Sequence, residues 1–165
     1  MVNPIQFDRF ILRPTLQAMA PEIQYSEAAR RLLLGTAAHE SGGFQFIDQV
    51  TAGGLQNDAD GPAYGLFQME AATHDDLWAN FLQFRQGIAA KVRMFRAPEP
   101  DGVRQARSNL CYAVATARAQ FYRARPPLPP ADELPALAAY WKDHWNTAMG
   151  AGTAAQWLLH YPKGL

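Results

Sequence analysis

A glutamate at the end of a predicted helix is the residue in this chain best suited to acid catalysis. In LLLGTAAHESGG, Leu33, Ala37 and Glu40 recur at i, i+4 and i+7, which puts them on one inward face of a helix. Burial disfavours an ionised carboxylate and raises its pKa. A carboxyl group that keeps its proton near neutral pH can give that proton to a leaving oxygen. The alternative, in which Glu40 turns out to solvent, fits the spacing equally well.

A second group of carboxylates follows in NDADGPAYGLFQME, residues 57–70, where Asp58, Asp60 and Glu70 surround a glycine-rich turn. Glycosidases commonly place two carboxyl groups across the bond they cleave, so any of the three could be the partner of Glu40. Aspartate also favours turns. Turn chemistry therefore accounts for at least one of the two aspartates without a catalytic role.

The histidines do not form a metal-binding pattern. The sequence HES begins like the zinc motif H-E-x-x-H, but Gly43 stands where the second histidine would be. The other histidines, His74, His144 and His160, are scattered, so we expect no metal and no cofactor. Cys111 lies in the apolar run NLCYAVA, and we interpret it as a small buried residue rather than a nucleophile.

The predicted helix that carries Glu40 has recognisable ends. Ser26 can cap its start, and the two glycines after HES would stop it. The following segment, 43–73, is rich in Gly, Asp and Asn and lacks a helical stripe. We predict a loop there, with a short hairpin around Gly53-Gly54. Long irregular segments inside compact domains are usually functional.

A single long helix is predicted after this loop. Thr73 and Asp76 form a capping-box-like start for the segment 74–96. Apolar residues then recur at helical spacing, which predicts a face packed against the core. The residues of this stripe are Leu77, Phe81, Phe84, Ile88, Val92 and Phe95.

Helical spacing continues to the end of the chain. We predict helices over about 103–123, from Asp132 to about Thr147 and from Thr153 onward, with one or two short helices near the N-terminus. Prolines in RARPPLPP, 123–130, cannot continue a helix, so we interpret this segment as a stiff connector rather than an SH3-type ligand. The sequence therefore predicts a mainly α fold in a single domain, 1–165. The expected inward face of 103–123 is formed by Leu110, Val114, Ala117 and Phe121.

The composition excludes several classes of protein. Lys+Arg and Asp+Glu both number 15 among 165 residues, which argues against a strongly basic nucleic-acid binder. Apolar residues make up 48% of the chain, too many for a disordered protein. A single cysteine excludes an internal disulfide and fits synthesis in a reducing cytoplasm. We expect no membrane span and no signal peptide, because MVNPIQFDRFILRP lacks a basic start and a long apolar stretch.

Two motifs in order resemble the soluble lytic transglycosylases and goose-type lysozymes. That group carries Glu-Ser at the end of a helix and a Gly-Leu-Met-Gln-like segment across the cleft; here HESGG, 39–43, is followed by YGLFQME, 64–70. The resemblance covers about 32–73. It implies a lysozyme-like α+β fold, with an active-site loop or small hairpin region after the catalytic helix, and a phage or prophage muramidase.

The resemblance also implies roles for single residues. It makes Glu40 the general acid, with Ser41 hydrogen-bonding near it and the substrate. Glu70 falls where goose-type enzymes have an aspartate that helps to place water, and Asp58 or Asp60 falls near a second such aspartate. The residues implied to line the sugar site are Tyr64, Gly65, Leu66 and Gln68.

Thinner matches lie further along the chain. Asn109 in NLCYAVA resembles the asparagine-containing helix of transglycosylases, and Tyr140 fits the first member of their Tyr-Asn pair. The next residue is Trp141 instead of asparagine, so the roles of Tyr140 and Asn146 remain open. Core packing is the alternative role for each aromatic ring that could stack on a sugar, and we favour it for Trp78. The candidate rings are Tyr64, Trp78, Trp141 and Trp145.

The sequence also fits three other interpretations. AHESGGF also resembles the first catalytic motif of plant-type chitinases and related phage endolysins, although the later segments match that group less well. The chain could also be an inactive lysozyme-like module, such as a phage structural part or a wall-binding domain. A lytic transglycosylase would close an anhydro ring on N-acetylmuramic acid with Glu40 alone, whereas a hydrolase needs a second carboxylate to position water. The extra carboxylates favour the hydrolase slightly.

The expected partner is peptidoglycan, without nucleic acid. We expect a protein made in the bacterial host cytoplasm that acts in the periplasm or cell wall, either as an endolysin or as a lysozyme carried in the virion. A type VI-style effector is a less favoured alternative. We expect a monomer, or a component of a phage particle.

Overall fold

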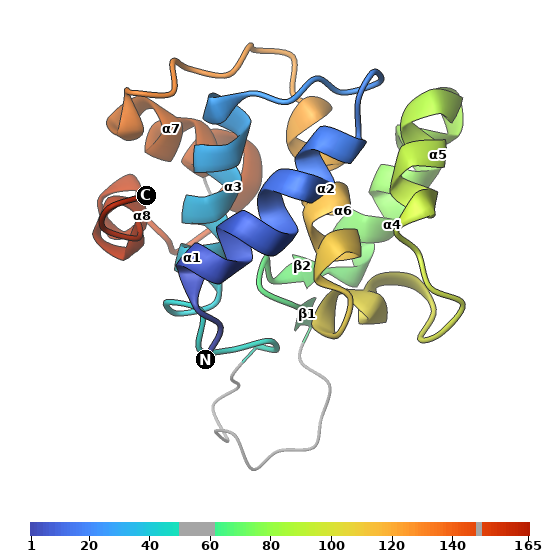
Figure 1. The fold of residues 1–165 in the computed structure, drawn as a ribbon, viewed down its shortest axis with the longest axis horizontal. Helices are drawn as coiled ribbons and strands as arrows, with labels where there is room; N and C mark the ends of the chain where they lie inside the picture. The colour runs from blue at the N-terminus through green and yellow to red at the C-terminus, as the bar shows by residue number, and fades with distance from the viewer. Residues whose placement is uncertain (50–61, 148–149) are drawn as a thin grey trace.

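The computed structural model describes residues 1–49, 62–147 and 150–165, and they form a mainly helical fold with a small antiparallel sheet. Figure 1 shows helix α3 beside α6, α7 and α8, while α4 and α5 lie on the other side of α6. No helix in the described part is both long and apolar enough to cross a membrane. The helices are α1 (Pro4–Phe7), α2 (Arg13–Ala18), α3 (Glu27–Glu40), α4 (Ala71–Asn80), α5 (Gln86–Met94), α6 (Leu110–Tyr122), α7 (Leu134–Trp141) and α8 (Ala154–His160).

Several predicted helix ends are confirmed. Ser26 caps α3 by accepting a hydrogen bond from the Ala29 backbone N–H, and Gly42 and Gly43 follow the helix with positive φ angles of 60° and 78°. Thr153 starts α8 with a capping box. The N-terminal helices are joined by a π-helical turn, Asp8–Leu12. These ends depend on side chains within one turn of the helix, which is why the local sequence predicts them.

The predicted long helix over 74–96 is wrong. The chain instead forms α4, a 3₁₀ turn (Leu82–Phe84) and α5, with non-helical φ angles of −134° at Phe81 and −131° at Arg85. This break buries Leu82 completely and leaves Phe84 68% exposed. Both short helices thereby turn apolar faces toward α6. A continuous helix would have fixed all six stripe residues on one line.

Two predicted caps and one burial assignment are also wrong. Thr73 lies inside α4, which begins after Glu70 without a side-chain cap, and Asp76 instead pairs with Arg123. Glu133, not Asp132, precedes α7, again without a side-chain hydrogen bond. Cys111 is only partly buried.

The predicted helix over about 103–123 is interrupted before Leu110, whereas the other two C-terminal helices follow the expected ranges. A 3₁₀ turn (Gly102–Arg107) precedes α6, and α7 continues through a π-helical turn, Lys142–Asn146, as far as Thr147. On the inward face of α6, Leu110 is partly buried and the other three predicted residues are buried. The residues buried on this face are Val114, Ala117 and Phe121.

The sheet consists of β1 (Ala63–Tyr64) and β2 (Met69–Glu70), paired antiparallel around a tight turn. Gly65 in this turn has φ +71°, and a Cβ there would lie 2.2 Å from the Ala106 carbonyl oxygen. Only glycine therefore lets the hairpin pack against the 3₁₀ turn before α6. The predicted loop thus contains a hairpin at 63–70, while the one expected around Gly53-Gly54 lies outside the described residues.

Helix α6 separates two apolar clusters. Val114, Ala117 and Phe121 face the larger cluster, formed with α1, α3, α7 and α8. Tyr112 and Ala115 face the smaller one, formed with α4, α5 and the end of the N-terminal segment. Because α6 is buried on both sides, it fixes how the α3 side and the α4–α5 side of the molecule are arranged.

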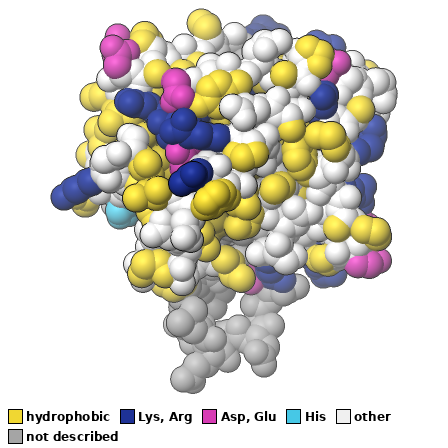
Figure 2. Space-filling model, in the orientation of Figure 1, with side chains coloured by type: hydrophobic (Ala, Val, Ile, Leu, Met, Phe, Trp, Pro, Cys, Tyr) yellow, Lys and Arg dark blue, Asp and Glu magenta, His cyan; other side chains and the backbone are white. Residues whose placement is uncertain are grey.

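A charge cluster fastens α3 to the N-terminal helices. The Arg30 guanidinium, almost fully buried, lies 3.1 Å from Asp8 and 2.6 Å from Glu27, and Arg13 lies 2.9 Å from Asp8. Figure 2 shows basic and acidic side chains together on this face, with hydrophobic side chains between them and no extended region of one charge. This agrees with the balanced composition of the chain.

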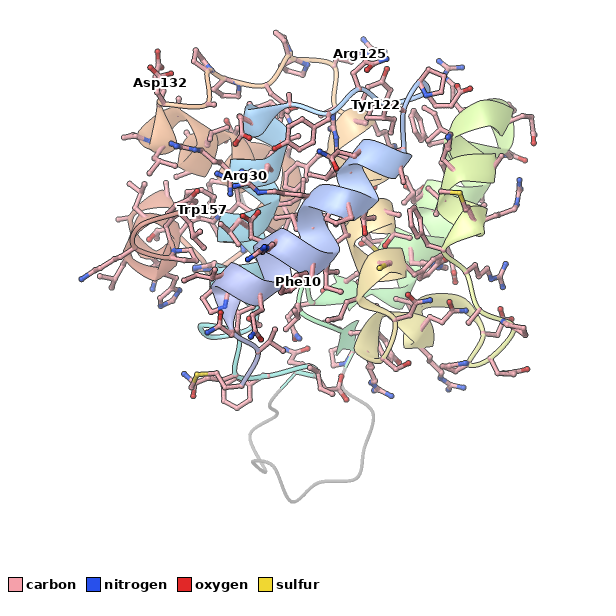
Figure 3. All side chains as sticks on the ribbon, viewed as in Figure 1. Phe10, Arg30, Tyr122, Arg125, Asp132 and Trp157 are labelled. Carbon is pink, nitrogen blue, oxygen red and sulfur yellow. The ribbon has the colours of Figure 1, made fainter. Side chains whose placement is uncertain are left out.

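Helix α8 packs closely on α3 because α3 contains a glycine. A Cβ at Gly35 would lie 2.0 Å from the Trp157 indole, a fully buried side chain (Figure 3). We expect Gly35→Ala to destabilise the fold by about 1–3 kcal/mol, the typical cost of overpacking a core. Urea unfolding should show this loss at unchanged m-value.

Gly87→Ala in α5 is the matched control, because a Cβ there meets only the flexible end of Glu22. We expect its effect to stay within about 1 kcal/mol. Equal stability changes at the two glycines would contradict the proposed role of the contact between Gly35 and Trp157.

Candidate active site

The position of Glu40 is fixed by the way α3 ends. The Ser41 hydroxyl donates to the Ala37 carbonyl at 2.6 Å and accepts from the Phe44 backbone N–H at 2.8 Å. Both interactions of the hydroxyl close the turn directly behind Glu40. Together with the two glycines, they reverse the chain at the last residue of the helix.

The Glu40 carboxyl lies against Trp141, the last residue of α7. The indole Nε1 donates a hydrogen bond to Glu40 Oε1 at 3.1 Å, and the Trp141 side chain is fully buried. Burial raises the pKa of Glu40 to about 7, and the hydrogen bond from Trp141 opposes this rise. The predicted inward position of Glu40 is therefore confirmed. At neutral pH a large fraction of this carboxyl group holds its proton.

His39 supports the same wall. Its ring packs edge-on against Trp141 with centroids 4.5 Å apart, and its Nδ1 lies 3.0 Å from Nδ1 of His160 on α8. Burial, followed by the neighbouring His160, lowers the pKa of His39. The neutral imidazole is thus favoured, and it does not supply a positive charge that would hold Glu40 ionised.

Glu40 lies where two adjoining cavities meet. They have volumes of about 310 Å³ and 520 Å³, and both are lined by Glu40, Gln68 and Glu70. The acid is therefore reached from both sides along one groove. Glu40 forms the α3 wall, and Gln68 and Glu70 form the wall at the hairpin.

The smaller cavity is mostly polar, with one aromatic ring among its described lining residues. Trp145 lines it and stacks on Phe121 behind it, with centroids 5.0 Å apart. Asn146 lines it too and accepts a hydrogen bond from Lys142 Nζ at 2.7 Å. Gln120 of α6 contributes an amide oxygen that is buried and has no hydrogen-bond partner in the described structure. These groups suit a ligand with hydroxyl and amide substituents.

The larger cavity lies toward the turn after α3. His39, Phe46 and Asp48 line it along with the shared residues. Asp48 pairs with Arg107 at 2.7 Å. This side of the groove therefore combines an aromatic side chain with a charge that is already compensated.

Four of the residues singled out in the sequence line the same cavity. Glu40, Gln68, Glu70 and Asn146 surround the smaller cavity, together with Trp145, one of the candidate sugar-stacking rings. The Gln68 side chain donates to the Gly65 carbonyl at 2.8 Å, which fixes its amide at the rim.

Other predicted sugar-site residues serve the structure beside the groove. Ser41 and Leu66 are fully buried, so a substrate does not reach them. The Tyr64 ring lies under the Arg107 guanidinium, 4.4 Å from its centroid, and is 8% exposed. Gly65 provides the close approach to Ala106. Placing these four residues in the sugar site is corrected: Tyr64, Gly65 and Leu66 build the hairpin that presents Gln68 and Glu70, and Ser41 closes the turn after α3.

Asn109 and Tyr140 do not line the groove. Asn109 caps α6 by accepting from the Tyr112 backbone N–H, and its amide donates to the Phe95 carbonyl at 2.7 Å. The Tyr140 hydroxyl donates to the Pro126 carbonyl at 3.0 Å. Both assignments to the sugar site are therefore corrected, because these side chains satisfy backbone groups elsewhere.

The remaining candidates have different outcomes. Asp58 and Asp60 lie outside the described residues. Trp78 packs against the smaller apolar cluster, which confirms the core-packing role that we favoured for it. Trp141 is buried rather than available for stacking, and its contact with Glu40 is missing from the sequence prediction. The resembling family has an asparagine at this position, which gives no sign of an indole donor.

The raised pKa of Glu40 makes a prediction about stability. A carboxyl group with a pKa near 4.5 when unfolded and about 7 when folded binds more protons in the folded state, so stability falls as pH rises between these values. Glu40→Gln removes this dependence. We expect the variant to be more stable than the wild type by up to about 3 kcal/mol at pH 8 and by little near pH 4, measured by urea unfolding.

Glu27→Gln, the same change at the other end of α3, is the control. Hydrogen bonding from Tyr25, then from Arg30, lowers the pKa of Glu27. Its replacement should therefore cost stability at neutral pH, the opposite sign. A pH-independent difference between wild type and Glu40→Gln would show that Glu40 titrates as an ordinary surface carboxyl.

Neither a family model, nor a curated protein, nor a solved structure matches this chain.

Proposed function

We propose that this protein is a peptidoglycan-degrading glycosidase that cleaves the β-1,4 bond between N-acetylmuramic acid and N-acetylglucosamine. The observation that carries the proposal is the Glu40 carboxyl, with a pKa of about 7, at the junction of two cavities. A polymer lying in both cavities would pass the acid in mid-chain. General acids of glycosidases share this combination of partial burial and raised pKa.

The groove suits a sugar polymer in its chemistry. The exposed part of Trp145 offers a ring face for a pyranose, and Gln68, Asn146 and Gln120 offer amide groups for hydroxyl and N-acetyl substituents. The balanced net charge means that recognition would rest on these contacts rather than on bulk attraction to an anionic wall.

In the proposed reaction, protonated Glu40 gives its proton to the glycosidic oxygen as the bond from that oxygen to the muramic acid C1 breaks. An oxocarbenium-like sugar forms. Water adds to C1 from the hairpin side, and Glu70 accepts its proton. Glu70 then releases its proton to solvent, and solvent returns a proton to Glu40. Glu70 is the second carboxylate that lines both cavities with Glu40.

A lytic transglycosylase reaction is the second candidate, and the pKa of Glu40 favours it too. In that reaction the 6-hydroxyl of the muramic acid attacks C1, and the Glu40 carboxylate takes the hydroxyl proton. One group with a pKa near 7 can act as acid and then as base. Like the hydrolase, this activity fits an endolysin or a virion-associated wall enzyme. A chitinase-like endolysin and an inactive wall-binding module are the remaining alternatives.

Glu40→Gln should lower the rate of peptidoglycan cleavage by roughly 10²- to 10⁴-fold, the usual contribution of general acid catalysis, while the protein stays folded. The assay is loss of turbidity in chloroform-treated Gram-negative cells. Mass spectrometry of the wild-type digest identifies the ending, because hydrolysis leaves reducing ends and transglycosylation leaves 1,6-anhydro ends.

Glu99→Gln, the same change at an exposed residue outside both cavities, is the matched control and should leave the rate unchanged. Retained activity in Glu40→Gln would exclude Glu40 as the acid. A folded wild-type protein that binds peptidoglycan without cleaving it would favour the inactive module instead.

Trp141→Phe should change how cleavage depends on pH. Activity should fall as pH rises through about 7, because Glu40 must keep its proton. The Trp141 hydrogen bond lowers the pKa of Glu40, so removing the donor should move this alkaline limb to higher pH. The measurement is initial rate against pH on purified peptidoglycan.

Trp157→Phe controls for lost packing, since Trp157 is equally buried on α8 but makes no hydrogen bond to a carboxyl. The alkaline limb of the pH–rate profile of this variant should lie at the same pH as in the wild type. If the alkaline limb of Trp141→Phe lies at the wild-type pH, a group other than Glu40 sets the pH dependence.

A further inference from the structure

A buried arginine without an acidic partner lies on α6, away from the groove. Arg118 is 6% exposed, and the described structure gives its guanidinium neither a hydrogen bond nor an ion pair. The Arg118 Cζ lies 5.4 Å from the centroid of the Tyr122 ring. Burial lowers the pKa of Arg118, and the groups that oppose this are the tyrosines at 122 and 140. Buried charges are normally paired.

Arg118 lines a cavity of about 420 Å³ between the end of α6 and the proline-rich connector. Arg125 lines the same cavity, and no aspartate or glutamate among the described residues does. Figure 3 shows Tyr122 and Arg125 at one edge of the molecule, where α6 gives way to the connector. The hydrogen bond from Tyr140 to the Pro126 carbonyl holds the connector over this cavity. Apolar walls are provided by Phe121, Pro127 and Leu128.

This arrangement has the properties of an oxyanion site. A guanidinium presents a planar fork of donors that matches phosphate or carboxylate oxygens. Arg118 is buried except where it borders the cavity, so a bound anion there would replace solvation that burial has removed. The cavity has two guanidinium groups and no carboxylate among its described lining residues. It therefore matches an anion of charge −2 better than an anion of charge −1.

We propose that the cavity between α6 and the proline-rich connector binds a phosphate dianion through Arg118 and Arg125. The apolar walls leave space for an organic group attached to the phosphate, so either free phosphate or a phosphate monoester is the ligand. The site is separate from the groove: on α6, Gln120 lines the groove and Arg118 lines this cavity. It therefore does not rest on the proposed glycosidase activity.

The stacked rings of Phe121 and Trp145 connect the phosphate cavity to the groove. Phe121 lines the phosphate cavity, and Trp145, 5.0 Å from it, lines the smaller cavity of the groove. Occupation of the cavity is therefore expected to change tryptophan fluorescence, which gives a second readout that needs no substrate.

The test is calorimetric titration of the full chain with inorganic phosphate, glycerol 3-phosphate and acetate at constant ionic strength. We expect both phosphates to bind with a Kd of about 1 mM or lower, and acetate to bind more weakly. Arg118→Met should weaken phosphate binding about tenfold or more, because it removes a charged donor. Arg125→Gln, at an exposed residue, should weaken it by roughly two- to fivefold.

Arg85→Gln, an exposed arginine outside the cavity, is the matched control and should bind phosphate like the wild type. Tighter binding of glycerol 3-phosphate would identify a monoester as the ligand, and equal binding would identify free phosphate. Absence of phosphate binding, equal affinity in Arg118→Met, or acetate binding as tight as phosphate would overturn the proposal. Arg125→Gln keeps the test valid if Arg118→Met does not fold.

Discussion

The contact between the Glu40 carboxyl and the Trp141 indole is the interaction on which the proposed chemistry depends. Burial between α3 and α7 raises the pKa of the carboxyl, and the indole N–H limits that rise and fixes one oxygen. The rest of the fold holds the two helix ends together. Ser41 and the glycines end α3 at the required residue, and α8 packs onto α3 through Gly35.

The hairpin is the second requirement of the site. Its buried residues, Tyr64, Gly65 and Leu66, pack against the core and the turn before α6, which leaves Gln68 and Glu70 to line the groove. A single partly buried acid at the junction of two cavities is sufficient for proton transfer to a leaving oxygen. The exposed carboxylate at the hairpin is the group through which hydrolysis and ring closure would differ.

The sequence predicts those features that depend on neighbouring residues. The helix ending at Glu40 follows from a serine cap and a glycine stop, and the inward position of its carboxyl follows from helical spacing. The break between α4 and α5 depends on packing against α6, which no local pattern encodes, so apolar periodicity wrongly suggests one helix. Motif likeness likewise does not separate Gln68, which lines the groove, from Tyr64, which supports it. The role of Trp141 requires the contact between two helices that are distant in sequence.

The most direct test of this account is the titration of Glu40 itself. In protein labelled with ¹³C at glutamate side chains, the Glu40 carboxyl resonance can be assigned by its absence in Glu40→Gln and followed against pH by NMR. The account predicts a midpoint near pH 7, well separated from an unperturbed glutamate at about 4.3. A midpoint close to 4.3 would contradict it, because Glu40 would then be ionised throughout the neutral range.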